Sequence, residues 1–301
     1  MKDILGRVRA GEILVGDGAW GTMLMARGLE PGQCPESLNL TRPEVLQEIA
    51  ALYLDAGAEF ITTNTFGGSP LKLADYSLED EAEEINRRAV EALRPVVGDR
   101  ALISASVGPT GKILLPYGDT APEIIADSFT RQIGALIEAG ADMICIETMI
   151  DMREARLAIE AAKSVSADIP IMATMTFDPT PNGFFTIMGT SVEQAAAGLE
   201  EAGADIVGAN CGNGIEKMIE IAAEFRRHSR LPIAIQSNAG LPENHAGEIV
   251  YPESPEFMAD KAGRLIDLGV SIIGGCCGTG PDHIRALRGL VDGRSRGQQP
   301  R

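Results

Sequence analysis

Eight short runs of apolar, largely β-branched residues alternate with helical patterns along the whole of this chain. The runs lie at residues 12–17, 59–66, 101–108, 142–148, 170–177, 205–211, 232–238 and 271–277. Between them, apolar residues recur at steps of three and four, for example in residues 43–57, 130–140, 193–203 and 255–269. This spacing is typical of a helix that covers a sheet with one face. Regular alternation of strand and helix predicts a parallel sheet.

A repeated phrase marks the ends of four helices. It reads DAGAEF, EAGADM, EAGADI and DLGVSI, and its glycines are Gly57, Gly140, Gly203 and Gly269. Glycine at this place adopts the left-handed conformation that closes a helix before the next strand. The phrase precedes every second strand, which suggests a doubled β-α unit. Helix starts are expected at capping boxes that begin at Thr41, Thr120 and Ser191.

Eight strands and their helices within 301 residues predict a (β/α)8 TIM barrel in a single domain, residues 1–290. The alternative is a doubly wound open sheet, for which we would expect a glycine-rich, dinucleotide-binding loop after the first strand. The segment DGAWG at residues 17–21 has the wrong spacing for that loop. The last residues, 291–301, are polar and basic without periodicity, so we expect a flexible tail or a linker.

Composition and charge narrow the function classes. The formal net charge of −17 argues against nucleic acid and anionic membrane surfaces as partners. No apolar run approaches the roughly 18–20 residues of a membrane span, and charges interrupt the N-terminal segment too early for a secretory signal. The five cysteines are odd in number and scattered, which favours reduced thiols. We therefore expect a cytoplasmic protein.

Three of the five cysteines fall at the carboxyl ends of predicted strands, where TIM barrels carry their functional residues. Cys211 ends the sixth strand, and Cys276 and Cys277 end the eighth. Three converging thiolates would hold Zn²⁺ and leave a fourth position open for water or substrate. Neighbouring strand residues point to opposite sides, so the glycines in GGCCG (274–278) are expected to let the backbone bend. The other two cysteines are expected to be buried apolar residues.

Three thiolate ligands give a zinc site a net negative charge, which makes it a weak Lewis acid. Such a site suits binding a substrate thiol as a nucleophilic thiolate, and so predicts transfer of an electrophilic group, most simply methyl, to a thiol. Asp17 and Glu147, at strand ends on the same rim, are candidates to hold a substrate ammonium. Thr65 and Ser106 end the second and third strands and are further candidates for the substrate site. Asn238 ends the seventh strand and is a candidate to fill the fourth zinc position when no thiol is bound.

Six segments resemble the homocysteine S-methyltransferase family. They are DGAWGT (17–22), TTNTF (62–66), IET (146–148), GANCGNG (208–214), QSNAGLP (236–242) and GGCCGTGPDHI (274–284). The resemblance spans about residues 10–290, and the pair GANC and GGCCG is its most specific part. Together with MGTSVEQ (188–194), the later segments are most similar to the homocysteine module of cobalamin-dependent methionine synthases.

The resemblance implies a TIM barrel with catalytic zinc on Cys211, Cys276 and Cys277. It also implies that Asp17 and Glu147 hold the amino group of homocysteine, whose thiol receives a methyl group to give methionine. The tryptophan of DGAWGT departs from the methionine that we expect in this family at that place.

The methyl donor is expected to be a methylated corrinoid of the methylcobalamin type. The three histidines, His228, His245 and His283, lie outside the DxHxxG pattern that binds a corrinoid, so a separate corrinoid protein or missing C-terminal domains would carry it. The loop at residues 178–190 would then be a lid or a docking surface. The alternative is a small donor such as S-methylmethionine or betaine, and betaine would call for an aromatic cage.

Two interpretations from other classes remain open at this point. One is a TIM barrel that binds a phosphate ligand at residues 274–280, with incidental cysteines. The other is a noncatalytic zinc or corrinoid-accessory protein.

Overall fold

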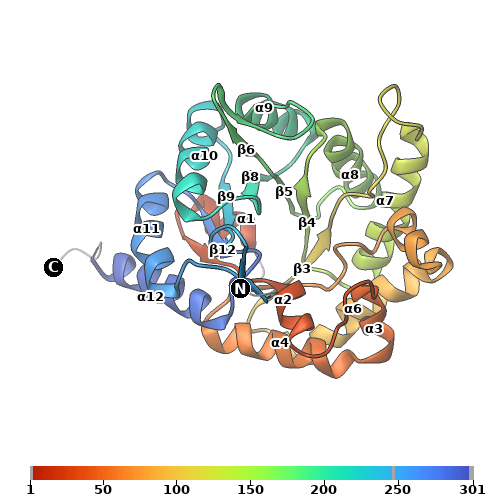
Figure 1. Ribbon diagram of the computed structural model, residues 1–301, viewed down its shortest axis with the longest axis horizontal. Helices are drawn as coiled ribbons and strands as arrows, with labels where there is room; N and C mark the ends of the chain where they lie inside the picture. The colour runs from red at the N-terminus through yellow and green to blue at the C-terminus, as the bar shows by residue number, and fades with distance from the viewer. Residues whose placement is uncertain (1–2, 246–247, 298–301) are drawn as a thin grey trace.

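The computed structural model describes residues 3–245 and 248–297, and these form a barrel of parallel strands surrounded by helices (Figure 1). The barrel strands are β1 (Leu14–Val15), β2 (Phe60–Thr62), β3 (Leu102–Val107), β4 (Met143–Met149), β5 (Ile171–Met175), β8 (Ile206–Asn210), β9 (Ile233–Ser237) and β12 (Ile272–Gly275). They pair in the order β1-β12-β9-β8-β5-β4-β3-β2. Between β1 and β2, the Glu59 N–H donates to the Val15 carbonyl oxygen at 2.8 Å and nearly closes the barrel. The predicted (β/α)8 fold is confirmed.

One long helix covers the outside of the sheet after each strand. These helices are α4 (Pro43–Ala56), α6 (Ala82–Val97), α7 (Pro122–Glu138), α8 (Met152–Val165), α9 (Val192–Ala202), α10 (Ile215–His228), α11 (Pro255–Asp267) and α12 (Pro281–Gly297). Short helices lie before them: α1 (Ile4–Arg9), α2 (Trp20–Met25), α3 (Leu38–Thr41), α5 (Pro70–Leu73), and the 3₁₀ turns η1 (Pro35–Ser37), η2 (Ala74–Tyr76) and η3 (Glu79–Glu81). Two hairpins extend loops at the carboxyl ends of the strands, β6 (Asp178–Thr180) with β7 (Gly183–Phe185), and β10 (Glu243–His245) with β11 (Glu248–Val250).

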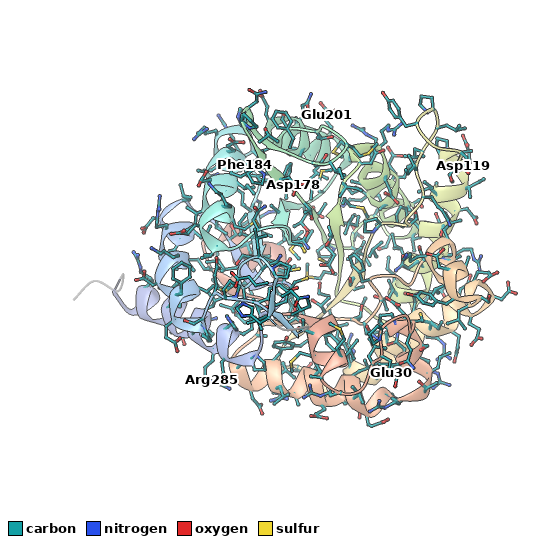
Figure 2. All side chains as sticks on the ribbon, in the orientation of Figure 1. Glu30, Asp119, Asp178, Phe184, Glu201 and Arg285 are labelled. Atoms are coloured by element: carbon teal, nitrogen blue, oxygen red, sulfur yellow. The ribbon has the colours of Figure 1, made fainter. Side chains whose placement is uncertain are left out.

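Side chains alternate between two buried clusters. Inward-facing residues such as Leu14, Phe60 and Cys145 fill the amino-terminal half of the barrel, where Ile4 and Val8 of α1 close its end. The residues between them face the outer helices and build the larger cluster. Charged side chains labelled in Figure 2, among them those of Glu30, Asp119, Glu201 and Arg285, lie at the edge of the molecule. The amino-terminal half of the barrel is therefore solid, and the opposite end holds the polar residues.

The helix ends follow the sequence more closely than the helix starts. All four glycines of the repeated phrase have positive φ, between 75° and 100°. The capping box at Ser191 is present, whereas those at Thr41 and Thr120 were wrong. The helices there begin one residue later, after Arg42 and Ala121, and proline in the first turn leaves one donor fewer to cap.

The end of the chain differs from the expected tail. Helix α12 continues to Gly297, past the predicted boundary at residue 290, and Val291 is buried in the outer cluster. Residues 298–301 of the expected tail lie outside the described residues. Within the described ranges, every helix is too short or too polar to cross a bilayer.

The repeated phrase also links neighbouring strands. Two residues after its glycine, an acidic side chain accepts a backbone N–H from the preceding strand, in three of the four copies. These bonds are Val15 N–H to Glu59 Oε2 at 3.0 Å, Ile103 N–H to Asp142 Oδ2 at 2.9 Å and Ile171 N–H to Asp205 Oδ2 at 3.0 Å. We call these three carboxylates the strand clasps. Each satisfies a donor at the start of a strand, where the ladder alone leaves it unpaired.

Candidate active site

The carboxyl ends of β8 and β12 bring three cysteine sulfurs together. Cys211 directly follows β8, and Cys276 and Cys277 directly follow β12. Their Sγ atoms all lie within 4.8 Å of one another, and those of Cys211 and Cys277 are 3.8 Å apart. Tetrahedral zinc with sulfur ligands at about 2.3 Å would space the sulfurs about 3.8 Å apart. The three cysteines therefore have the spacing of a zinc site.

A tight turn explains how adjacent cysteines face the same point. The Thr279 N–H donates to the Cys276 carbonyl oxygen at 3.1 Å and closes a four-residue turn. Gly278 is its third residue with φ of 80°, the sign that a type II turn requires there. Gly275 serves close packing instead, since a Cβ atom there would lie 2.1 Å from Thr279 Oγ1. The backbone bend predicted from GGCCG thus lies after the cysteines, at Gly278.

Two residues beside the site have a left-handed backbone that glycine normally adopts. Cys211 and Thr148 both have φ of 60°. A register shift in β4 spans Glu147 and Thr148, and such a bulge re-aims a side chain. Asn210 fixes this bulge, because its Oδ1 accepts the Thr148 N–H at 2.7 Å and its Nδ2 donates to Thr148 Oγ1 at 2.7 Å. Strain of this kind costs about 1–3 kcal/mol per residue and is typical of functional sites.

A cavity of about 330 Å³ lies at the mouth of the barrel, and all three cysteines line it together with the carboxylates of Asp17, Glu147 and Glu36. Asp17 accepts hydrogen bonds from Trp20 Nε1 at 2.9 Å and from the Thr62 N–H at 2.7 Å. Ser106 Oγ donates to Glu147 Oε1. These donors orient the Asp17 and Glu147 carboxylates toward the cavity without neutralising their charge.

The surroundings of the Asp17 and Glu147 carboxylates favour a positively charged group beside them. Burial raises the pKa of Asp17 to about 6. Burial raises the pKa of Glu147 to about 7, and the nearby charge of Asp17 adds to this shift. A positively charged group placed between them would relieve both the desolvation and the repulsion. The ammonium of an amino-acid substrate is such a group.

The three thiols cannot all ionise without a cation. The pKa of Cys277 is lowered, because the thiols of Cys211 and Cys276 donate hydrogen bonds to its sulfur. The pKa of Cys276 is raised well above its ordinary value, because hydrogen bonding with the sulfurs of Cys211 and Cys277 favours its protonated form. One thiolate therefore keeps its neighbours protonated, and three thiolates at this spacing would repel one another. This donor set fits a divalent metal ion such as Zn²⁺.

The remaining site residues predicted from the sequence differ in whether they reach the cavity. Ser106 lines the cavity, whereas Thr65 is fully buried behind it and its hydroxyl donates to the Ser106 carbonyl oxygen at 2.7 Å. Asn238 is 4% exposed and is not among the cavity-lining residues. Its N–H donates to the Asn213 carbonyl oxygen at 3.0 Å, and its Oδ1 has no hydrogen-bond partner among the described residues. Cys34 and Cys145 are buried, as expected, and neither is among the cavity-lining residues.

Three residues that sequence reasoning did not select also belong to the site. Asn210 and Gln236 share the inward direction of Ile206 and Ala234 on their strands, so strict alternation along β8 and β9 would have found them. Tyr251 follows the β10–β11 hairpin and lies over the cysteine turn, where a Cβ atom on Gly278 would meet its ring at 2.1 Å. No local pattern marks Tyr251, because the hairpin alone brings it there.

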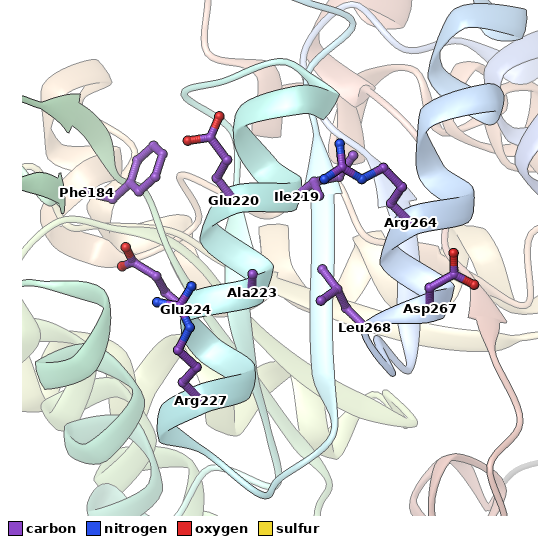
Figure 3. Close-up of a pocket in the computed structure, with 9 residues that line it drawn as sticks. All are labelled: Phe184, Ile219, Glu220, Ala223, Glu224, Arg227, Arg264, Asp267 and Leu268. Carbon is purple, nitrogen blue, oxygen red and sulfur yellow. The ribbon is translucent and has the colours of Figure 1, made fainter.

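A second hollow, of about 420 Å³, lies on the outside of the barrel between α10 and α11 (Figure 3). Phe184 from the β6–β7 hairpin, Ile219, Arg227 and Arg264 are among its lining residues. It has no cysteine or histidine in its wall. Among the described residues, the cysteines and buried carboxylates suited to catalysis therefore lie at the cavity in the mouth and not at this hollow.

Comparison with known sequences gives a family and two long relatives. The model of the family described as homocysteine S-methyltransferase matches residues 14–291. The methionine synthase of Mycobacterium leprae (strain TN) is 33% identical over 311 residues, covering 97% of this chain and 25% of its own length. The methionine synthase of Mycobacterium tuberculosis (strain ATCC 25618 / H37Rv) is 34% identical over 298 residues, covering 93% of this chain and 24% of its own length. The chain thus spans about a quarter of these relatives.

Solved structures of homocysteine methyltransferase MmuM from Escherichia coli have the same fold. The metallated form gives a TM-score of 0.76 at 22% identity, covering 92% of this chain and 96% of that chain. The oxidized form gives a TM-score of 0.75 at 23% identity, covering 92% and 95%.

Proposed function

The chain belongs to the homocysteine S-methyltransferase family, and from that premise we propose that it methylates the thiol of homocysteine to form methionine. One observation carries the proposal: three cysteine sulfurs and the carboxylates of Asp17 and Glu147 line a single cavity at the mouth of the barrel. Sulfur ligands suit a thiophilic metal and a substrate thiol. Paired carboxylates suit an ammonium. Homocysteine carries a thiol at one end and an ammonium at the other.

The proposed metal is Zn²⁺, held by Cys211, Cys276 and Cys277. The sulfur spacing, and the inability of the three thiols to ionise together without a cation, support this assignment. Bound there, Zn²⁺ would lower the pKa of the substrate thiol so that sulfur reacts as a thiolate. Asn238 is the proposed stand-in ligand before substrate binds, since its Oδ1 has no hydrogen-bond partner among the described residues, although Asn238 does not line the cavity. We expect the reaction in the cytoplasm, where thiols stay reduced.

The chain's own residues bind and orient the substrate. Asp17 and Glu147 hold the ammonium, and the indole of Trp20 and the hydroxyl of Ser106 fix the two carboxylates. Holding the ammonium in this way also positions the sulfur at the other end of the substrate. This sulfur attacks the methyl carbon of the donor. A sulfur–carbon bond forms, the bond from methyl to donor breaks with its electron pair leaving on the donor, and the thiol proton passes to solvent.

The proposed donor is a methylated corrinoid, carried by a separate protein or by further domains. Its support is that the similar methionine synthases are about four times as long as the matched region. The loops around the mouth also expose large apolar side chains, with Tyr117 77%, Ile187 74% and Ile249 61% exposed. We call these three residues, which lie on three different loops of the mouth, the rim patch. Exposed apolar side chains on several loops around one opening would suit a surface that meets a partner.

A small cationic donor is the second candidate. Three aromatic residues, Trp20, Phe66 and Tyr251, line the cavity. Aromatic faces attract sulfonium and quaternary ammonium groups, so S-methylmethionine or betaine would be accommodated next to the sulfurs.

A donor panel tests both candidates. Zinc-loaded protein with homocysteine is offered methylcobalamin, S-methylmethionine or betaine, and methionine is measured by mass spectrometry. We expect methionine with methylcobalamin, and turnover with a small donor alone would refute the corrinoid proposal.

Metal dependence is tested in the same assay. Cys211→Ala should abolish zinc binding and activity, while Cys34→Ala, which removes a sulfur that does not line the cavity, should retain zinc binding. Full turnover by metal-free Cys211→Ala protein would refute the role of zinc.

A further inference from the structure

Gln236 on β9 presents an unused acceptor to the cavity. Its side chain is 5% exposed and lines the cavity together with Asp17 and Glu147. Its Oε1 has no hydrogen-bond partner among the described residues. A buried amide oxygen left in this state is unfavourable, so a donor is expected to meet it when the site is filled.

The neighbouring strand makes room for this side chain. Gln236 pairs with Gly274 on β12. A Cβ atom on Gly274 would lie 3.2 Å from Gln236 Cγ and 3.3 Å from the Asp17 carbonyl oxygen. The glycine therefore lets Gln236 lie across β12, on the side of the barrel where Asp17 sits.

Counting acceptor sites shows what the cavity still has to satisfy. Asp17 Oδ2 already accepts two hydrogen bonds and Oδ1 accepts one, from Thr62 Oγ1 at 2.7 Å. Glu147 Oε2 accepts a single long bond from Asn210 Nδ2 at 3.3 Å. A carboxylate oxygen has two acceptor sites. Asp17, Glu147 and Gln236 thus each keep at least one free acceptor site, and a primary ammonium has three N–H groups to place.

We propose that Gln236 Oε1 is the third acceptor for the substrate ammonium and makes the site selective for a free primary amine. This inference rests on the proposed function. A neutral amide completes the shell without a third negative charge, which would add repulsion between the carboxylates. A thiol lacking the amine would leave all three acceptors unpaired, so the site should bind it much more weakly than homocysteine.

Isothermal titration of zinc-loaded protein with two ligands tests the proposal. L-homocysteine carries the ammonium, and 4-mercaptobutanoate lacks it but keeps the thiol, the carboxylate and the chain length. Gln236→Met preserves length and removes the acceptor. We expect this variant to bind homocysteine about tenfold to hundredfold more weakly, with the affinity for 4-mercaptobutanoate unchanged. Gln236→Glu keeps an acceptor oxygen in either protonation state and should restore most of the homocysteine affinity.

A matched control separates recognition from stability. Gln132 is also fully buried with an unpartnered Oε1, yet it is not among the cavity-lining residues. Gln132→Met should leave the preference between the two ligands as in the wild type. If Gln236→Met does not fold, Gln236→Asn withdraws the acceptor by one methylene and takes its place in the titration.

The outcomes are distinct. The proposal on Gln236 is overturned if the variant loses affinity for both ligands equally or for neither, or if Gln236→Glu binds homocysteine as weakly as Gln236→Met. If wild-type, zinc-loaded protein fails to bind homocysteine at all, the proposed function itself is wrong.

Discussion

One residue, Asn210, connects the cysteines of the site with the carboxylate of Glu147 on β4. Asn210 immediately precedes the cysteine on β8, yet its amide reaches β4, donating to Glu147 Oε2 at 3.3 Å and bracing the strained Thr148. It is completely buried, so no water would replace these bonds on truncation. Asn210 therefore positions the carboxylate end of the site relative to the sulfur end.

Replacing this amide should affect substrate binding more than metal binding. Asn210→Ala should lower kcat/KM for homocysteine about tenfold to hundredfold, mainly through KM, because Glu147 loses its orientation. Zinc content, measured by atomic absorption, should stay near that of the wild type, since the three sulfurs remain. Asn182→Ala, in an exposed hairpin turn, serves as the control. Zinc loss as large as the activity loss would contradict this division of roles.

The buried carboxylate of Glu147 is expected to lower the stability of the folded protein at the pH values where it is charged. Its pKa is raised by burial from 4.5 to about 7. Between those values the folded chain binds more protons than the unfolded chain, so the neutral acid stabilises the fold below pH 4.5 and this contribution is lost as the pH rises through 7. Above pH 7 a charged carboxylate remains buried beside Asp17.

Removing that charge should stabilise the substrate-free protein at alkaline pH. Glu147→Gln is expected to raise the free energy of unfolding at pH 8 by on the order of 1–3 kcal/mol, and to change it little at pH 4.5. Urea unfolding at the two pH values measures the difference. A stabilisation independent of pH would show that the charge of Glu147 is not its cause.

At the scale of elements, the strand clasps couple successive β-α units. Asp205 precedes β8, but its carboxylate accepts the Ile171 N–H at the start of β5 and pairs with Lys163 on α8 at 3.4 Å. One residue thus joins two strands, β5 and β8, and the helix that precedes the first of them. The same geometry recurs at Glu59 and Asp142.

Truncating one clasp should loosen the barrel without touching the site. Asp205→Ala leaves the Ile171 N–H without its acceptor and should lower the free energy of unfolding by about 1–3 kcal/mol. Asp205→Asn keeps an acceptor oxygen and should recover most of that loss. Glu160→Ala, on the exposed face of α8, should change the urea midpoint very little. Equal effects of the alanine and asparagine variants would assign the stability to the ion pair instead.

Elements that depend on local rules were predictable, and those that depend on tertiary contacts were not. The glycines at positions 57, 140, 203 and 269 need positive φ wherever the chain goes, so the helix ends follow from the sequence. The capping boxes at Thr41 and Thr120 fail because proline pre-sets the first turn one residue later. The cysteines follow from their place at strand ends. The bulge at Thr148 and the approach of Tyr251 arise from contacts between distant segments.

At the scale of the whole molecule, the two ends of the barrel differ in role: one is a packed core and the other carries the candidate reactive side chains. Its amino-terminal end is filled by apolar residues and closed by α1, while the opposite mouth carries the sulfurs, the carboxylates and the rim patch. Ile187 follows the β6–β7 hairpin after β5, and Ile249 lies in β11 after β9, so the rim patch draws on more than one loop of the mouth. A partner that delivers a methyl group to the cavity must contact these loops.

This arrangement makes the two donors separable by one surface substitution. Ile187→Glu places a charge in the rim patch, and a charge that is desolvated at an interface weakens docking strongly. Methyl transfer from a protein-bound corrinoid should fall at least about tenfold, whereas transfer from free methylcobalamin, which needs only the cavity, should stay within about twofold of the wild type. Leu52→Glu, on α4 outside the mouth, should affect neither rate. Parallel loss with both donors would place Ile187 in the cavity's own function rather than in docking.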